Sequence, residues 1–255
     1  MTSTIIMRGA CLWHFTLQYL HINGEIINHQ KNRVDYCEKF NKNKSSGINV
    51  EEVKKYYEEK KLLEGHLDIL KQEERDIFGY KKASVLLMDS YSELVDKLFI
   101  NKKNGSSFCA CYTDFNHTED FISNYNCLDM ISLDNLYEAY FNFFALFNKT
   151  YGEIPIIFIN FPTKFENRAK YKERGKAIEN VMEKISHLFS NIKIVKLDFC
   201  EKRKEDNMPY HFSNETYELL AKKISELNLK GISLHSEYQK KILIKFKNKF
   251  RLFSI

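Results

Sequence analysis

Residues 155–162 decide the fold class of this chain, and they run Pro155-Ile156-Ile157-Phe158-Ile159-Asn160-Phe161-Pro162. A continuous apolar run that ends in polar and turn-forming residues is typical of a strand buried on both faces of a sheet. Shorter or less regular runs predict further strands at residues 5–7, 83–88 and 192–197. We therefore predict a central sheet that is covered by helices on both sides.

Helical spacing of apolar residues occurs in the stretches between these strands. It predicts helices over residues 12–22, 133–147, 168–189 and 216–227. Strands that alternate with helices indicate an α/β fold, here an αβα sandwich with a mainly parallel central sheet. In such a sheet we expect the functional residues where the strands end, at the carboxyl edge.

The composition divides the chain into three parts. Residues 28–82 are rich in charged residues, and we expect a helical insertion there, including a long helix over residues 50–78 with one apolar stripe. The predicted domain covers residues 1–235 and contains this insertion. Residues 236–255 form a basic amphipathic tail.

The totals limit the classes of function. With 255 residues and 44% hydrophobic residues, the chain is large enough for one domain with a well-formed core. Six Lys and Arg residues against one Glu lie in residues 236–255, and this equals the net charge of +5 for the whole chain. Because residues 1–235 are neutral overall, we expect no nucleic acid partner.

Two interpretations of the tail remain open. As a basic amphipathic helix, residues 236–255 would contact an anionic membrane surface. As a final strand or a partner-docking segment, they would pack against protein. The six cysteines include no pair of CxxC motifs, so we expect no metal site. The chain starts without a signal peptide pattern, and we expect a cytoplasmic protein with reduced thiols, with the inner face of the membrane as the site of any peripheral contact.

A histidine in a short loop is the strongest functional signal. It lies in the segment Pro209-Tyr210-His211-Phe212-Ser213-Asn214-Glu215-Thr216-Tyr217. Ser213 or Asn214 is expected to cap the helix that follows, and Glu215 adds a carboxylate near its positive end. A histidine held at the start of a rigid helix is well placed to act as a general base, so we assign that role to His211.

The polar residues at the predicted strand ends have a familiar order. They are Gly9-Ala10-Cys11, Asp89-Ser90, Asn160 and finally His211. This order resembles the SGNH/GDSL hydrolase superfamily, and most closely its divergent bacterial members linked to surface-polysaccharide (capsule) biosynthesis. The resemblance implies a flavodoxin-like sandwich, a nucleophile in the turn after the first strand, and an oxyanion hole that includes a glycine and an asparagine. No metal or resident cofactor is implied, although a transferase would use an acyl donor such as acetyl-CoA.

The chain departs from the family pattern at two places. The family serine is absent after Gly9, so either Cys11 replaces it, or Ser90 is the nucleophile, or catalysis has been lost. The family aspartate three residues before the histidine is replaced by Met208. The carboxylate that orients the imidazole is therefore Asp206 or is missing.

Each candidate residue also has a structural interpretation. A thiol at the amide end of a helix favours thiolate, which supports Cys11, but a small buried cysteine would fit the same turn. For Ser90 we favour a helix cap over a nucleophile. Asn160 is either an oxyanion donor or the Asx-turn that ends its strand. Asp89 and Gly9 are assigned to the oxyanion or substrate region. Arg168 is assigned to the same region as a clamp for an anionic group, although we favour a solvated helical face as its role.

These observations predict an enzyme that transfers or hydrolyses an acyl group on a carbohydrate. The expected activity is that of an O-acetyltransferase or esterase acting on a surface polysaccharide or its precursor. The first alternative is a catalytically degenerate protein of the same fold that binds a glycan or a biosynthetic partner. The second is a structural partner protein built around the helix expected at residues 50–78.

Overall fold

A parallel sheet forms the centre of the molecule. The computed structural model describes residues 4–43, 48–58, 76–204, 209–227, 229 and 234–236. In this part of the chain the central sheet has five strands in the order β3-β1-β4-β8-β9, and every neighbouring pair is parallel. The strands are β1 (Thr4–Arg8), β3 (Glu25–Asn28), β4 (Val85–Asp89), β8 (Ile156–Ile159) and β9 (Ile192–Val195). The predicted α/β fold with a mainly parallel sheet is confirmed.

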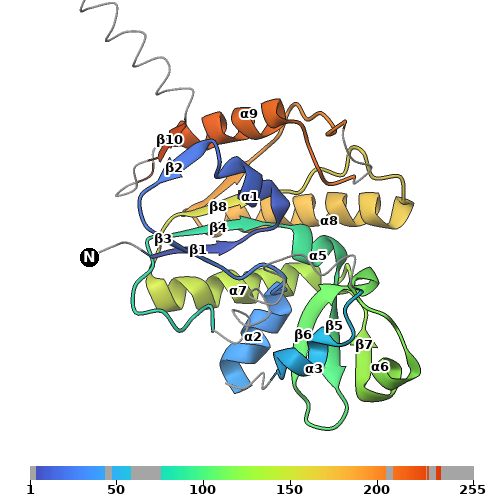
Figure 1. Cartoon of the computed structure of the whole chain (residues 1–255). Helices are drawn as coiled ribbons and strands as arrows, with labels where there is room; N and C mark the ends of the chain where they lie inside the picture. Colours follow the sequence, from blue (N-terminus) through green and yellow to red (C-terminus); the bar gives the residue numbers. More distant parts are fainter. Residues whose placement is uncertain are drawn as a thin grey trace, which may run out of the picture.

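Helices cover both faces of this sheet (Figure 1). One face carries α1 (Cys11–Thr16) and α9 (Asn214–Ser225), which contact each other. The other carries α2 (Val34–Asn43), α7 (Leu136–Tyr151) and α8 (Ala169–Ser186), with α7 in contact with both of the others. Every residue of β4 and β8 is buried. Their side chains point to both faces of the sheet, so helices are needed on both faces to keep these apolar residues from water.

The strand order puts a switch in chain direction at the centre of the sheet. From β1 the chain goes outward to β3 on one side, and later from β4 to β8 and β9 on the other. In open α/β sheets, ligands bind outside the carboxyl ends of the strands at such a switch. The residues at this switch are those that follow β1 and β4, beginning with Gly9 and Ser90.

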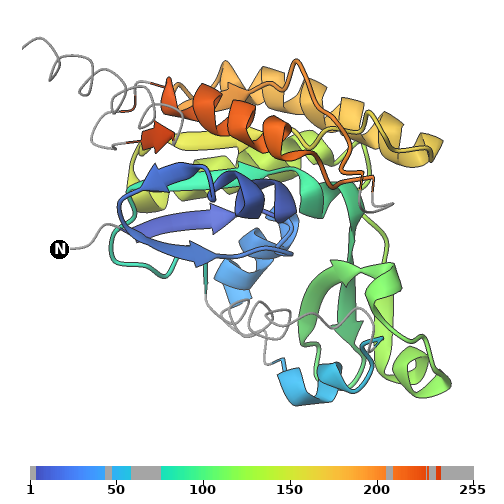
Figure 2. The ribbon, with the colours of Figure 1, turned by 45° about the horizontal axis from the view of Figure 1, so that its top comes forward.

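A second sheet follows the short helix α5 (Tyr91–Val95). Its strands β5 (Asp96–Asn101), β6 (Ser107–Cys111) and β7 (Tyr125–Leu128) are antiparallel in the order β6-β5-β7. A 3-10 turn (Tyr112–Asp114) and α6 (Glu119–Asn124) connect β6 to β7. Figure 2 shows this unit projecting below the central sheet. Its core is aromatic, with rings from Tyr56, Tyr57, Phe99, Phe108, Phe115, Phe121 and Tyr125.

Two predicted helices are shorter than expected. The helix expected over residues 12–22 ends at Thr16, and residues 20–22 form β2 (Leu20–Ile22), which pairs antiparallel with β10 (Leu234–Ser236). The helix expected over residues 50–78 ends early, as α3 (Val50–Lys54). It ends there because Tyr57 forms a bridge with Phe115 and packs its ring into the aromatic core of the second sheet.

Other predictions stand or remain open. The helices expected over residues 133–147, 168–189 and 216–227 are confirmed as α7, α8 and α9, with ends shifted by a few residues. Residues 59–75 and 237–255 lie outside the described residues, so the predicted insertion and basic tail remain predictions.

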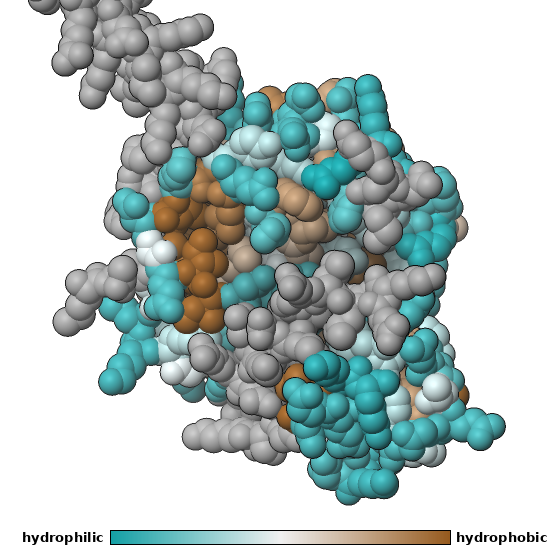
Figure 3. All heavy atoms as spheres, in the orientation of Figure 1, coloured by the Kyte–Doolittle hydropathy of each residue, from teal (hydrophilic) through white to brown (hydrophobic). Residues whose placement is uncertain are grey.

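The surface gives two further observations. In the described part of the chain, no helix combines the length and the apolar content that crossing a bilayer requires. Apolar side chains gather over β2 and the edge strand β3 in the view of Figure 3. Ile26 of β3 is 40% exposed.

Candidate active site

The ends of β1 and β4 are joined by the carboxylate of Asp89. Its Oδ2 accepts a hydrogen bond from the Ala10 amide at 2.8 Å, and its Oδ1 accepts one from the Tyr91 amide at 3.0 Å. Asp89 is buried, and burial raises its pKa to about 7 although both amides favour the charged form. Asp89 thus connects two strand ends and caps α5, and both carboxylate oxygens have protein partners.

Gly9 is required by a close approach of the chain to itself. A Cβ atom at this position would lie 2.5 Å from the indole ring of Trp13, which is fully buried one turn into α1. The Gly9 amide points toward the Asn28 side chain, with 3.5 Å between the amide nitrogen and Oδ1. Because the amides of Gly9 and Ala10 both face protein oxygens, an oxyanion would have to displace one of these contacts.

Cys11 lies at the start of α1 and contacts the histidine loop. Its Sγ donates to the Tyr210 carbonyl at 3.5 Å. Burial, followed by the nearby Asp89 charge, raises the pKa of the Cys11 thiol to about 12, and the amides of Cys11 and Leu12 only partly oppose this. The expected thiolate is therefore wrong: the side chain is a neutral thiol near pH 7.

His211 lies at the same edge of the sheet as Cys11. It is partly buried, and its ring meets the ring of Phe15 from α1 edge-on at 6.1 Å between centroids. The loop is held by the Arg203 amide, which donates to the His211 carbonyl at 3.0 Å. Ser213, rather than Asn214, caps α9, because its Oγ accepts from the Thr216 amide.

Ser90 and Asn160 form a pair at the ends of β4 and β8. The Ser90 hydroxyl donates to Asn160 Oδ1 at 3.0 Å and accepts from the Phe161 amide at 2.8 Å. Ser90 occupies the N-cap position of α5 but makes no cap hydrogen bond with its side chain. With 1% exposure and two partners, its hydroxyl links neighbouring strand ends in this conformation.

The Asn160 amide is directed toward α8. Its Nδ2 donates to the Gly175 carbonyl of α8 at 3.4 Å, and the side chain lines a groove beside that helix. The structure thus joins Asn160 to Ser90, as expected for neighbouring strand ends, but gives it no contact with Cys11 or His211.

Arg168 is held by a carboxylate that the sequence did not single out. Its guanidinium forms a two-pronged ion pair with Glu166, at 2.8 Å from Nε and 2.7 Å from Nη2. Glu166 also accepts from the Tyr210 hydroxyl at 2.5 Å. These hydrogen bonds lower the pKa of Glu166 to about 2. The cluster anchors the residue that precedes His211, and no spacing pattern in the sequence distinguishes Glu166 from the other acidic residues.

A second unpredicted network lies beneath the strand ends. The buried Arg8 side chain forms an ion pair with the buried Glu93 and donates to the carbonyls of Asn32 and Asp89. Glu93 in turn accepts from the Val34 amide at 2.9 Å and the Tyr140 hydroxyl at 3.0 Å. This network fixes β1, α5, α2 and α7 to one another.

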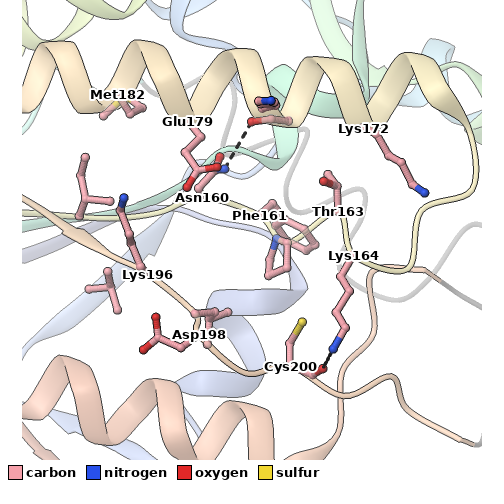
Figure 4. A pocket seen from close by; sticks show the side chains of 16 residues that line it. Asn160, Phe161, Thr163, Lys164, Lys172, Glu179, Met182, Lys196, Asp198 and Cys200 are labelled. Atoms are coloured by element: carbon pink, nitrogen blue, oxygen red, sulfur yellow. Dashed lines mark hydrogen bonds between the residues drawn. The ribbon is translucent and has the colours of Figure 1, made fainter.

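A groove opens beside this edge, at the ends of β8 and β9 (Figure 4). It has a volume of about 720 Å³ and lies between α8 and the segment that follows β9. Asn160 is the one predicted site residue that lines it. In the described residues, no group of three or more His, Cys, Asp or Glu side chains has an arrangement that could hold a metal ion.

Asp206, the predicted partner of His211, lies outside the described residues. Its role therefore remains a prediction.

Comparisons with known proteins find weak similarity in structure and no match in sequence. The sequence matches no model of a protein family, and it matches no curated protein sequence. Among solved structures, an acetyl xylan esterase from the rumen bacterium Butyrivibrio proteoclasticus is similar at 10% sequence identity and a TM-score of 0.38. The match covers 87% of this chain and 62% of that chain, so this chain spans about three fifths of the esterase's length.

Proposed function

We propose that the carboxyl edge of the central sheet transfers or hydrolyses an acyl group on a carbohydrate, with Cys11 and His211 as the reacting pair. One observation carries this proposal: Cys11 Sγ lies 3.5 Å from the carbonyl of Tyr210, the residue that precedes His211. The thiol thus contacts the loop that carries the imidazole, although the two residues are 200 positions apart in the sequence. Nucleophilic catalysis requires such a pair.

The raised pKa of Cys11 defines the first step. Because the thiol is neutral near pH 7, it needs a base to become a nucleophile. His211 would accept the thiol proton while Sγ forms a bond to the acyl carbon. It would return that proton to the leaving group, which is the alcohol oxygen of an ester or the sulfur of a thioester donor. In the second step His211 takes a proton from water or a sugar hydroxyl, which attacks the thioester and releases Cys11 as a thiol.

The finer parts of the proposal rest on the family resemblance. These are the surface polysaccharide as acceptor, a donor such as acetyl-CoA for the transferase version, and Asp206 as the group that orients His211. Asn160 is a candidate oxyanion donor only if its amide turns away from the Gly175 carbonyl.

Acetate release from acetylated oligosaccharides and from 4-nitrophenyl acetate tests the proposal. We expect Cys11→Ala and His211→Ala to reduce the rate by at least about 100-fold. Ser90→Ala should keep most of the activity if Cys11 is the nucleophile, and Cys127→Ala is the control for an exposed thiol. Activity that persists in both Cys11→Ala and His211→Ala would contradict the proposal.

A non-catalytic role is the second candidate, and the same residues favour it. A partly buried neutral thiol bonded to a carbonyl, together with a serine hydroxyl that has two protein partners, also describes a site that only maintains structure. In that case the edge would bind a glycan or a biosynthetic partner without turnover, and all of the variants above would bind while none, including the wild type, released acetate.

A further inference from the structure

The groove beside α8 has the dimensions of a small-molecule site. Its volume of about 720 Å³ lies in the range of roughly 300–1,000 Å³ that is usual for ligand pockets. It opens at the carboxyl ends of β8 and β9, where parallel sheets bind their ligands. Neither Cys11 nor His211 lines it, so its occupant is a question separate from the acyl chemistry.

The charges around the groove favour an anion. Lysine side chains reach it from three segments, and they are Lys164, Lys172, Lys176 and Lys196, against the two acids Glu179 and Asp198. Asp198 is paired with Lys223, and Lys196 with Glu183, both of which lie outside the lining. The remaining charged side chains in the lining of the groove are three lysines and Glu179.

Two of these lysines have no structural explanation in the described chain. Lys172 and Lys176 are exposed, lie one turn apart on α8, and have no ion-pair partner among the residues that the structure describes. Like charges four residues apart destabilise a helix by a few tenths of a kcal/mol, so helix stability does not account for the pair. Lys164 lies across the groove from Lys172 in Figure 4 and donates to the Cys200 carbonyl at 3.3 Å.

The floor of the groove adds an amide and an apolar surface. Asn160 lines the groove with its Oδ1 accepting from Ser90 and its amide nitrogen donating to the Gly175 carbonyl of α8. In Figure 4 the Glu179 carboxylate points from α8 toward Asn160, away from the Lys172 end. The apolar lining residues include Phe161, Met182, Ile194, Val195 and Leu197. An anionic group would therefore lie at the lysine end, with the organic part of the ligand along the apolar floor.

We propose that this groove binds a small phosphate-bearing molecule, with Lys172, Lys176 and Lys164 contacting the phosphate and the apolar floor contacting its organic part. Phosphate is the anion chosen because three lysines from α8 and the loop after β8 line the groove, and its three oxygens accept from several donors at once. The proposal does not depend on acyl transfer and would survive the failure of that function.

Calorimetric titration of the whole protein tests this site. The probes are inorganic phosphate, adenosine monophosphate and glucose 1-phosphate, with adenosine and glucose as phosphate-free references. The double variant Lys172→Ala/Lys176→Ala is compared with Lys149→Ala/Lys184→Ala, which removes the same charge from exposed positions that do not line the groove. Thermal unfolding of each variant verifies that it folds.

We expect saturable binding of at least one phosphorylated probe and none of the references. The groove variant should weaken that binding at least about tenfold, while the control variant should change it less than about twofold. Absence of saturable binding to the wild type would overturn the proposal. Equal weakening by the two double variants would overturn it as well, since that result indicates only a general effect of net charge.

Discussion

Two polar regions lie next to each other at the end of β1, and they differ in burial and in the number of hydrogen bonds that hold them. The inner region is the Arg8–Glu93 network, which is fully buried and joined to neighbouring elements by several hydrogen bonds. The outer region is the rim formed by Cys11, Tyr210 and His211, in which Cys11 and His211 are partly buried and Cys11 is joined to the loop by one long thiol contact. The comparison indicates that the inner groups build the edge, whereas Cys11 and His211 of the outer region remain partly exposed to solvent.

Removal of one charge from the inner network should produce the largest effect. Glu93→Ala leaves the Arg8 guanidinium buried without its carboxylate, and we expect a loss of about 3–5 kcal/mol in the free energy of unfolding. Urea unfolding measures this. Glu183→Ala is the control, because its ion pair with Lys196 is exposed and should contribute less than about 1 kcal/mol. A similar loss in both variants would remove the distinction between the inner network and the surface.

Asp89 lies between the two regions and should make stability depend on pH. Its pKa in the folded protein, about 7, is above the usual value near 4, so the folded state holds this proton more tightly than the unfolded state. The contribution to stability is full below about pH 4 and is lost as the pH rises to 7, by about 2–4 kcal/mol.

Asp89→Asn should flatten that part of the stability profile. Thermal unfolding between pH 4 and pH 8 gives the comparison, with the exposed Asp134→Asn as control. If the Asp89→Asn and wild-type profiles run parallel, Asp89 is not a buried titrating group.

Gly9→Ala tests how tightly the turn is packed between the two regions. The added methyl group would meet the Trp13 ring, and we expect a loss of about 1–3 kcal/mol in the free energy of unfolding. In a Trp13→Leu background the same substitution should cost less, because the clashing ring is absent. An equal cost in both backgrounds would show that the ring is not the obstacle.

Tyr210→Phe should have the smallest effect on stability and acts on the outer region. It removes the hydroxyl that donates to Glu166 but leaves the Glu166–Arg168 ion pair in place, so we expect a loss of about 1 kcal/mol. Urea unfolding measures the change. A loss as large as that of Glu93→Ala would mean that the rim is as much a structural element as the inner network.

The sequence predicts the frame of this molecule better than its side-chain networks. The runs at residues 83–88 and 155–159 identify β4 and β8 because strands buried on both faces need uninterrupted apolar residues. The second sheet was not predicted, since β5 and β6 mix Asp, Lys and Ser with aromatic residues and take their burial from Tyr56 and Tyr57 of a distant segment.

The site shows the same division. Cys11 follows a predicted strand, and residues after parallel strands lie at the carboxyl edge of the sheet. The contact of Cys11 with the His211 loop at that edge agrees with this expectation. Protonation was not predictable, since the pKa of Cys11 depends on burial that only the packed turn creates. Glu166 and Glu93 were missed for a related reason, because nothing local in the sequence separates a buried acid from a solvated one.

The alkylation rate of Cys11 tests the central claim most directly. Iodoacetamide labelling between pH 6 and pH 9, followed by peptide mass spectrometry, gives the rates of Cys11 and of the exposed Cys127 in the same sample. If His211 takes the thiol proton, His211→Ala should slow labelling of Cys11 at pH 7 by at least about tenfold and leave Cys127 unchanged. Unchanged labelling of Cys11 in His211→Ala would contradict the account and leave the two residues as neighbours without a shared reaction.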